Sequence, residues 1–178
     1  MRRLIIVLLA VVSMITSCEK EEKVKYSGFA LFTSEPGGEF FINGYGFSFE
    51  QGKNIICADI NCKQADIVTG HLILQTEINE VFLTSPENQE AFHLNASFDN
   101  EDEAVAYYDD YGEVTAQDFD FSAGNLQPNQ VWTFQSAAKK YAKIRIIEIQ
   151  HYYDANYPFA EVRVEYHYQP SGSGIFNR

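Results

Sequence analysis

The sequence has little positive charge. It contains 13 Lys and Arg residues against 25 Asp and Glu residues, which gives a formal net charge of −12 at pH 7. Lys and Arg are absent from residues 64–138, a stretch that holds fourteen Asp and Glu residues. An acidic chain of this kind does not attract a nucleic-acid backbone or anionic lipid head groups, so no nucleic-acid partner is expected.

The acidic stretch is nevertheless rich in aromatic residues. Nine of its carboxylates lie between Asp99 and Asp120. The aromatic residues of the same part of the chain are Phe98, Tyr107, Tyr108, Tyr111, Phe119 and Phe121. Disordered acidic segments usually contain few aromatic residues, so we expect this part of the chain to be folded.

The sequence also lacks the common catalytic motifs. It contains no G-x-S-x-G, H-E-x-x-H, G-x-G-x-x-G or P-loop pattern. Pairs of carboxylates could hydrolyse glycosides only at a defined separation, which a sequence does not show. We therefore expect a protein that is not an enzyme.

Long apolar runs are limited to residues 4–15, in which only Ser13 is polar. This run is shorter than the ~20 residues that span a bilayer. Arg2 and Arg3 precede it, and a short basic segment followed by an apolar one is typical of a secretory signal peptide.

A cysteine follows the apolar run directly. Ile15, Thr16 and Ser17 precede Cys18, and a branched apolar residue, two small residues and a cysteine resemble the bacterial lipobox. In a lipobox the cysteine thiol takes a lipid and the leader is cut just before it. We expect residues 1–17 to be a lipoprotein signal peptide and Cys18 to carry the lipid; the alternative is an ordinary signal peptide with a chance cysteine.

The residues after Cys18 are charged. Residues 19–22 (EKEE) resemble the surface-export signal of Bacteroidota lipoproteins, and the alternative is a plain solvated tether. A buried lipid chain contributes ~0.8 kcal/mol per methylene, and stable anchoring takes more than one chain. We expect residues 18–25 to be a lipidated tether, and a multiply acylated Cys18 to hold the protein at the outer membrane, on the cell surface.

Two cysteines remain in the rest of the chain, Cys57 and Cys62. The segment "CADINC" would close a small loop if they are bridged, and the cell envelope is oxidising enough for a disulfide. Two free buried thiols are the alternative. Two cysteines alone make a poor metal site, so no metal is expected.

The dominant pattern along residues 26–178 is an alternation of apolar and polar residues, which is typical of half-buried strands. Apolar residues expected on buried faces before the C-terminal segment are Tyr45, Phe47, Phe49, Leu72, Leu74, Ile78, Phe92, Leu94, Ala96, Phe98, Trp132 and Phe134. Residues 71–78 fit one strand, Gly52 supplies a turn, and only a helical turn is expected near residues 102–108. The pattern predicts a single all-β domain, an antiparallel sandwich-like fold.

The C-terminal segment, residues 141–169, predicts two strands joined at "YYDANYP". The second strand places Val162, Val164, Tyr166 and Tyr168 on one face. In the first strand the apolar phase changes between Ile146 and Ile147, which predicts a β-bulge there.

The histidine and acidic side chains offer few candidate ligands for a metal ion or haem. His93 and His167 fall on polar strand faces, while His71 and His151 lie near strand ends, and no local spacing forces two of them together. The clusters "DNEDE" and "YYDDYGE" could bind Ca²⁺, but they do not match an EF-hand because Ala104 stands where that loop has glycine. A solvated acidic loop is the favoured interpretation.

Three stretches of the chain carry a family resemblance: "NGYGFSFEQGK", "QADIVTGHLIL" and "NQVWTFQSAAKKYAKIRIIEIQHYYDANYPFAEVRVEYHYQ". They resemble the HmuY-like haem-binding surface lipoproteins of Bacteroidota over roughly half of the mature chain. That family has an aromatic "FSF…GK" strand, a following W-D or A-D strand, and a C-terminal hairpin that opens on Y-A-K or I-A-K and closes on Y-x-Y. The matching positions are Phe47 to Lys53, Ala65 to Ile67, Tyr141 to Lys143 and Tyr166 to Tyr168.

The resemblance implies an HmuY-like all-β fold and ligand binding without catalysis; some members of the family capture haem for an outer-membrane transporter. The family's haem ligands are paired His, or Met in some relatives, from the central region; here that region has no Met and one histidine, His93, the candidate cofactor-binding residue. A Tyr ligand would come from Tyr107, Tyr108 or Tyr111. Haem propionates favour nearby Lys or Arg, which residues 64–138 lack. The alternative is a structural or accessory surface protein that contacts a protein or glycan without haem.

Overall fold

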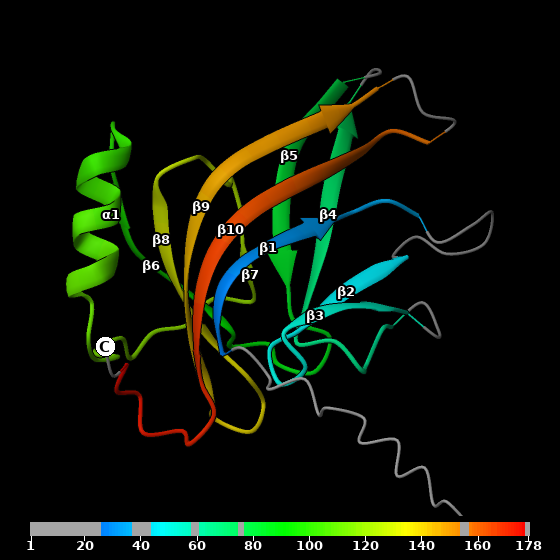
Figure 1. Cartoon of the computed structure of the whole chain (residues 1–178). Helices are drawn as coiled ribbons and strands as arrows, with labels where there is room; N and C mark the ends of the chain where they lie inside the picture. The colour runs from blue at the N-terminus through cyan, green and yellow to red at the C-terminus, as the bar shows by residue number, and fades with distance from the viewer. Residues whose placement is uncertain (1–25, 37–43, 58–60, 75–76, 154–156, 177–178) are drawn as a thin grey trace, which may run out of the picture.

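The computed structural model describes residues 26–36, 44–57, 61–74, 77–153 and 157–176. Within these ranges, two antiparallel sheets of five strands pack against each other, and a helix covers one outer face (Figure 1). The expected all-β, antiparallel and sandwich-like fold is confirmed. The leader, Cys18 and the tether, all predicted within residues 1–25, lie outside the described residues.

Each sheet combines strands from distant parts of the chain. Sheet A has the strand order β1-β10-β9-β8-β6, and sheet B has the order β3-β2-β4-β5-β7. The strands of sheet A are β1 (Ser27–Thr33), β6 (Phe92–Ser97), β8 (Gln130–Gln135), β9 (Tyr141–Tyr152) and β10 (Phe159–Gln169). The strands of sheet B are β2 (Tyr45–Ser48), β3 (Lys53–Ile56), β4 (Ile67–Leu74), β5 (Glu77–Thr84) and β7 (Ser122–Ala123).

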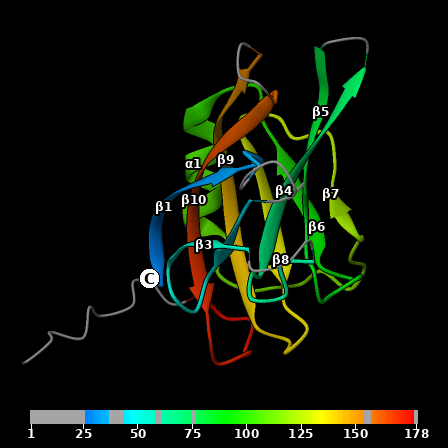
Figure 2. The same cartoon turned by 90° about the vertical axis from the view of Figure 1, so that its right-hand side faces the viewer.

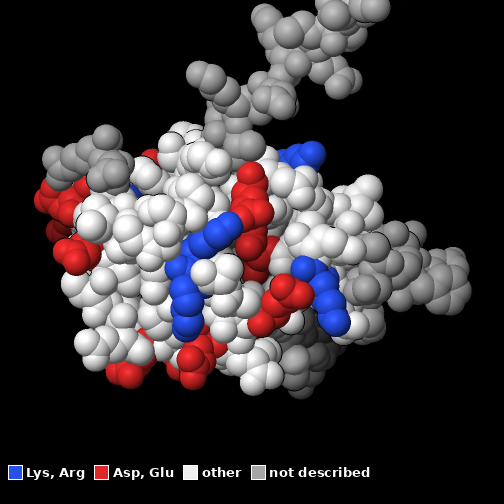
Figure 3. Space-filling model, turned by 90° about the horizontal axis from the view of Figure 1, so that it is seen from below, with Lys and Arg blue, Asp and Glu red and all other residues white. Residues whose placement is uncertain are grey.

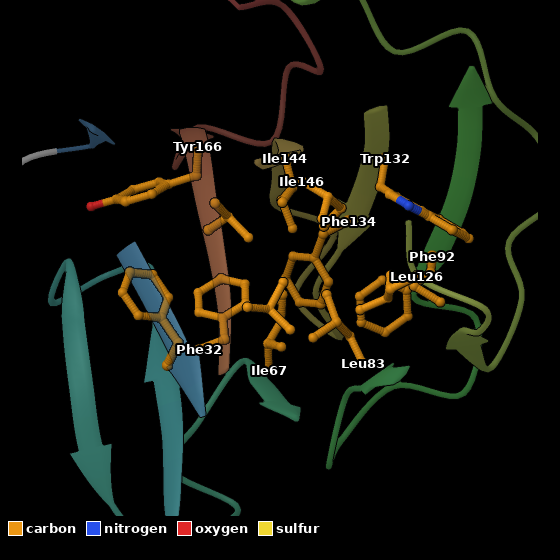
Figure 4. Close-up of a cluster of buried hydrophobic side chains, with 14 of the residues drawn as sticks. Phe32, Ile67, Leu83, Phe92, Leu126, Trp132, Phe134, Ile144, Ile146 and Tyr166 are labelled. Carbon is orange, nitrogen blue, oxygen red and sulfur yellow. The ribbon is translucent and has the colours of Figure 1, made fainter. Parts of the chain in front are cut away.

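Apolar side chains from both sheets fill the space between them (Figure 4). Sheet A contributes Phe134, Ile144 and Ile146, and sheet B contributes Ile67 and Leu83, none of which is more than 1% exposed. Removal of this apolar surface from water is the main force that holds the two sheets together.

The C-terminal hairpin of β9 and β10 is arranged as the sequence predicts. The expected buried residues of β10 are all buried: Val162, Val164, Tyr166 and Tyr168. Arg163 lies opposite Glu148, whereas Val164 lies opposite Ile146, so Ile147 has no residue opposite it. The predicted β-bulge between Ile146 and Ile147 is confirmed.

Two other strand predictions are wrong. Residues 71–78 do not form one strand, because β4 ends and β5 begins within them, and Leu74 pairs with Glu77 across the resulting hairpin. Leu72 is therefore 46% exposed, while Ile78 is buried. Leu94 was expected inside but is 40% exposed, because β6 is an edge strand whose register shifts beside this residue.

A disulfide joins Cys57 to Cys62, with the two Cα atoms 4.6 Å apart. It lies in a small apolar cluster with Ala65 and Val68. Gly46 of β2 lies under this cluster, and a Cβ there would overlap the Cβ of Ala65 and come within 3.1 Å of the Cys62 sulfur. Glycine at position 46 therefore lets the disulfide segment pack closely on sheet B.

The helix, α1 (Glu101–Asp110), is longer than the turn expected near residues 102–108. The Asn100 side chain caps its start by accepting a hydrogen bond from the Glu103 amide at 3.0 Å. Three acidic residues follow in the first turn, where negative charge interacts favourably with the helix dipole. α1 lies on the side of sheet A away from sheet B, so it is behind the sheets in the view from sheet B (Figure 2).

Candidate functional site

The outer face of sheet A beneath α1 buries polar side chains. Thr133 of β8 is 0% exposed, Lys143 of β9 is 6% exposed and Arg145 of β9 is 4% exposed. Buried polar groups need hydrogen-bond partners and buried charges need counter-charges or acceptors. Partners for all three side chains come from α1 or from a neighbouring strand.

Lys143 holds the C-terminal end of α1. Its Nζ donates hydrogen bonds to the carbonyl oxygens of Tyr108, at 2.6 Å, and Tyr111, at 3.1 Å. The ammonium also lies 4.4 Å from the centroid of the Tyr108 ring and 5.6 Å from that of Phe176. The last turn of α1 has no basic residue of its own, so Lys143 supplies from the sheet the positive charge that stabilises a helix C-terminus.

Arg145 connects the other end of α1 to the sheet. Its Nε and Nη2 donate to Glu165 Oε2 at 3.0 and 2.9 Å, and its Nη1 reaches Glu101 Oε1 at 3.4 Å. The Tyr111 hydroxyl lies 2.9 Å from Thr133 Oγ1. Because α1 is fixed near both ends, the surfaces around it have a defined shape.

A groove of about 510 Å³ lies beneath the C-terminal end of α1. We call it the α1 groove. Its principal lining residues are Tyr108, Asp109 and Asp110 of α1, Glu165 and His167 of β10, and Phe176 of the C-terminal segment. A volume of this size lies within the ~300–1,000 Å³ range of small-molecule sites.

The C-terminal segment forms one wall of the α1 groove. The Phe176 amide donates to the Gly112 carbonyl, and the Val114 amide donates to the Gly174 carbonyl, both at 2.8 Å. Gly174 has a φ of 71°, a conformation that favours glycine. These two hydrogen bonds fasten the C-terminal segment to the residues after α1.

Negative charge dominates the α1 groove. Three carboxylates line it, from Asp109, Asp110 and Glu165, beside the negative end of the α1 dipole. Lys143 adds one positive charge to the lining, and Glu165 is paired with Arg145, so the excess negative charge comes from Asp109 and Asp110. The arrangement suits a ligand that carries a positive charge and opposes an anionic one.

Two titratable groups in the α1 groove stay uncharged near neutral pH. Burial raises the pKa of the Tyr108 phenol, with the negative charge of Glu165 as the next cause. Burial lowers the pKa of His167, and the positive charge of Lys143 lowers it further. Both groups can therefore donate or accept hydrogen bonds without adding charge.

His93, the predicted haem ligand, does not line the α1 groove. It lies on β6, opposite Thr133, with its Nδ1 2.8 Å from the Asp118 carbonyl oxygen and its ring 6.1 Å from that of Phe119. A proton on Nδ1 donated to that carbonyl leaves a lone pair on Nε2, the tautomer that metal-ligating histidines use.

Haem fits the surroundings of His93 only in part. Tyr111, one candidate second ligand, approaches the same Thr133, but burial raises the pKa of its phenol and disfavours the phenolate that iron binds. Tyr107 stacks on Tyr111, with centroids 6.0 Å apart. Lys143 and Arg145, on the adjacent strand β9, already bond carbonyls and carboxylates, so they are poorly placed to pair with propionates.

The other histidines do not gather with His93. His71 Nδ1 lies 2.7 Å from Ser34 Oγ, and His151 Nδ1 lies 3.0 Å from the Tyr153 hydroxyl. Within the described ranges, no group of three or more His, Cys, Asp and Glu side chains could hold a metal ion. The two acidic clusters belong to α1 and its flanks and not to one loop, and the acids in the first turn of α1 face solvent as expected.

Lys143 and Arg145 are the site residues that sequence reasoning missed. Both occupy alternate positions of a strand whose other residues, Ile144 and Ile146, are apolar. Such positions usually face water, and no pattern within the strand indicates the cover that α1 provides.

No helix in the described part of the chain is long and apolar enough to cross a membrane. Comparison of the chain with protein-family models, with curated proteins and with solved structures found no match.

Proposed function

We propose that this chain is a lipid-anchored surface protein that captures a ligand in the α1 groove without catalysing a reaction. The observation that carries this proposal is the groove itself, about 510 Å³ in volume and lined by aromatic rings and carboxylates. Its walls are held in place by the buried Lys143 and Arg145, and binding sites on such supported elements need little reorganisation.

The location rests on the sequence. The lipobox-like residues before Cys18 and the charged tether after it support an anchor in the outer membrane and export to the cell surface. The Cys57–Cys62 disulfide is consistent with an oxidising compartment outside the cytoplasm.

Membership of the HmuY-like family is part of the proposal. Its motif positions fall on framework strands: Phe47 on β2, Tyr141 on β9, and Tyr166 and Tyr168 on β10. An outer-membrane transporter is the proposed partner, because a captured ligand has to be passed across the membrane to be used.

Shift mapping by NMR tests ligand binding in the α1 groove. The probe is spermidine, a polyamine, with the dianion glutarate as its charge-reversed counterpart, added to the labelled mature chain in detergent. We expect spermidine to move the amide signals of Tyr108, His167 and Phe176, and glutarate to leave them in place. Groove signals that respond to neither probe, or more strongly to glutarate, would contradict the proposal.

A charge variant sharpens the same test. Asp109→Asn combined with Asp110→Asn should weaken spermidine binding about tenfold, since each exposed ion pair contributes roughly 0.2–1 kcal/mol and 1.4 kcal/mol is tenfold. Asp102→Asn, at the opposite end of α1, is the matched control and should leave the dissociation constant unchanged. Equal losses in both variants would mean that net charge, not the groove, attracts the probe.

Haem capture is the second candidate function. The orientation of His93 by the Asp118 carbonyl, at 2.8 Å, favours it. Titration of the mature chain with haem should shift the Soret band, and His93→Ala should abolish the shift while His151→Ala leaves it. A titration without a shift, or one that His93→Ala does not change, removes this candidate.

A further inference from the structure

A second cavity, separate from the α1 groove, lies at one end of the sandwich. Its volume is about 260 Å³. Four connections reach it: the turn between β2 and β3, the residues before β4, the residues after β5 and the turn between β8 and β9. We call it the end cavity. Figure 3 shows the molecule from below, with acidic and basic side chains lying next to each other on this face.

Hydroxyl groups are the common feature of the lining of the end cavity. They come from Ser48, Ser85, Ser136 and Tyr168. Ser48 Oγ accepts a hydrogen bond from the Gln51 amide and Ser136 Oγ accepts one from the Lys140 amide, which fixes the position of these two hydroxyls. A hydroxyl both donates and accepts a hydrogen bond, so this lining complements a ligand that does the same.

Tyr168 is fixed at the base of the end cavity. The residue is 1% exposed, and its ring stacks on Phe49 with the centroids 5.4 Å apart. Burial and the nearby carboxylates of Asp66 and Glu50 raise the pKa of its phenol. The phenol therefore stays protonated and offers a hydrogen-bond donor in a set position.

Asp66 is fixed in the wall of the same cavity. Its Oδ2 accepts a hydrogen bond from the Phe49 amide at 2.8 Å, which ties the carboxyl group to the turn after β2. Burial is the main cause that raises its pKa. A carboxyl group held in this way can accept hydrogen bonds from two adjacent hydroxyls of a ligand.

The charges around the end cavity nearly balance. Lys140 forms an ion pair with Glu50. Lys63 and Glu87 add one charge of each sign, and Asp66 adds one acid. Such a lining gives little preference to a strongly charged ligand of either sign, in contrast to the acidic α1 groove.

We propose that the end cavity binds a neutral sugar ring, such as one sugar unit of a glycan. The cavity is smaller than the ~300–1,000 Å³ of drug-sized sites, which suits a single ring. The hydroxyls of the lining, a fixed carboxyl acceptor and a fixed phenol donor match the neighbouring donors and acceptors of a pyranose. The proposal does not depend on a ligand in the α1 groove.

Saturation-transfer NMR on the mature chain in detergent tests this site, with glucose, galactose, mannose and N-acetylglucosamine as probes. We expect transfer to at least one sugar, and Asp66→Asn should weaken its binding at least tenfold. Asn can still accept the Phe49 amide, so the turn is kept, and thermal unfolding checks this. Ser85→Ala is a second variant that removes one hydroxyl of the lining and should weaken binding several-fold.

Each outcome of the sugar experiment decides the proposal. Transfer that both variants reduce, and that Asp109→Asn combined with Asp110→Asn leaves unchanged, supports the end cavity as the sugar site. Absence of transfer to all four sugars overturns it. Transfer that the Asp66 and Ser85 variants leave intact, or that the α1 groove variant removes, also overturns it. Spermidine binding to the α1 groove is measured in a separate experiment, so absence of binding at one site does not imply absence of binding at the other.

Discussion

Sheet A is buried on its inner face and, beneath α1, also on its outer face, but with opposite kinds of side chain. On β9, Ile144 and Ile146 point into the sandwich and are 0% exposed. Lys143 and Arg145 alternate with them, point toward α1 and are almost equally buried. The inner face relies on apolar area, whereas the outer face relies on hydrogen bonds to named partners.

The two faces therefore have different tasks. Hydrophobic burial has no preferred direction, so the inner face stabilises the fold through the amount of surface it removes from water. Hydrogen bonds and ion pairs require defined geometry, so the outer face fixes the position of α1 and with it the shape of the α1 groove. Variants on the two faces should differ accordingly.

The largest effect is expected on the inner face. Phe134→Ala removes a 0% exposed ring from the centre of the core, and such substitutions cost about 3–5 kcal/mol. Urea unfolding followed by circular dichroism should show this loss in the free energy of unfolding. Leu94→Ala, at the exposed edge of the same sheet, is the control and should cost much less. A loss at Phe134 below ~1 kcal/mol would contradict the central role of the inner face.

The next effect is expected on the outer face. Lys143→Met removes the ammonium but keeps an apolar stem, and it leaves the carbonyls of Tyr108 and Tyr111 without their donor. We expect a loss of about 1.5–3 kcal/mol, the range for hydrogen bonds to a charged group, and faster hydrogen exchange across α1. Lys53→Met, on the exposed strand β3, should change neither measurement. Unchanged exchange in α1 would show that Lys143 does not hold the helix.

The inner face could be predicted from the sequence because its signal is local. Alternating apolar residues of β10 identified its buried side, and a change of phase at Ile147 identified the bulge. Failures came where the same alternation continues across a turn. Apolar residues stay in phase on both sides of residues 75–76, so the hairpin of β4 and β5 looked like one strand.

The outer face could not be predicted because its burial comes from a distant segment. Lys143 and Arg145 look solvent-exposed in their own strand, and the helix that covers them, α1, lies more than thirty residues earlier in the chain. The α1 groove combines α1, β1, β9, β10 and the C-terminal segment, and no local spacing records that they meet. His93 was found because it was the single histidine of its region, yet its position relative to the groove required the fold.

Sheet B carries a small apolar cluster built around the Cys57–Cys62 disulfide, which allows a third test. Replacing Cys57 and Cys62 together by Ser should lower the free energy of unfolding by about 2 kcal/mol, as expected when a loop with a sequence separation of 5 is no longer closed. Reduction of the wild type with dithiothreitol should produce the same loss and should not affect the double variant. A larger loss on reduction than on substitution would point to a further effect of the free thiols.

A smaller loss of stability is expected when the N-terminal cap of α1 is removed without changing its contacts with sheet A. Asn100→Ala removes the side chain that caps α1 and should cost about 1 kcal/mol. Asn100→Asp keeps an acceptor at the same place and should retain most of the stability. Both are measured by urea unfolding. If Asn100→Ala costs as much as Lys143→Met, the start of α1 matters as much as the end that Lys143 holds.

The smallest expected effect is that of two histidines, one on the inner face of sheet B and one on the outer face of sheet A, on the pH dependence of stability. His71 pairs with Val81 on the core side of sheet B, and His167 lies on the outer face of sheet A. The pKa of each histidine is lowered, mainly by burial. The charge of His151 also lowers the first pKa, and that of Lys143 the second.

Both histidines have an ordinary pKa of 6.5. Because the unfolded chain binds protons more readily than the folded one, their contribution to stability is fully present above this pH and is lost as the pH falls through the lowered values. Urea unfolding at pH 7.5 and pH 5.0 should show a loss of stability on acidification, and His71→Asn and His167→Asn should each reduce that loss. If only His167→Asn reduces the loss, the pH dependence of stability comes from the outer face alone. A ligand in the α1 groove that contacts neutral His167 should then bind more weakly at pH 5.0 as well.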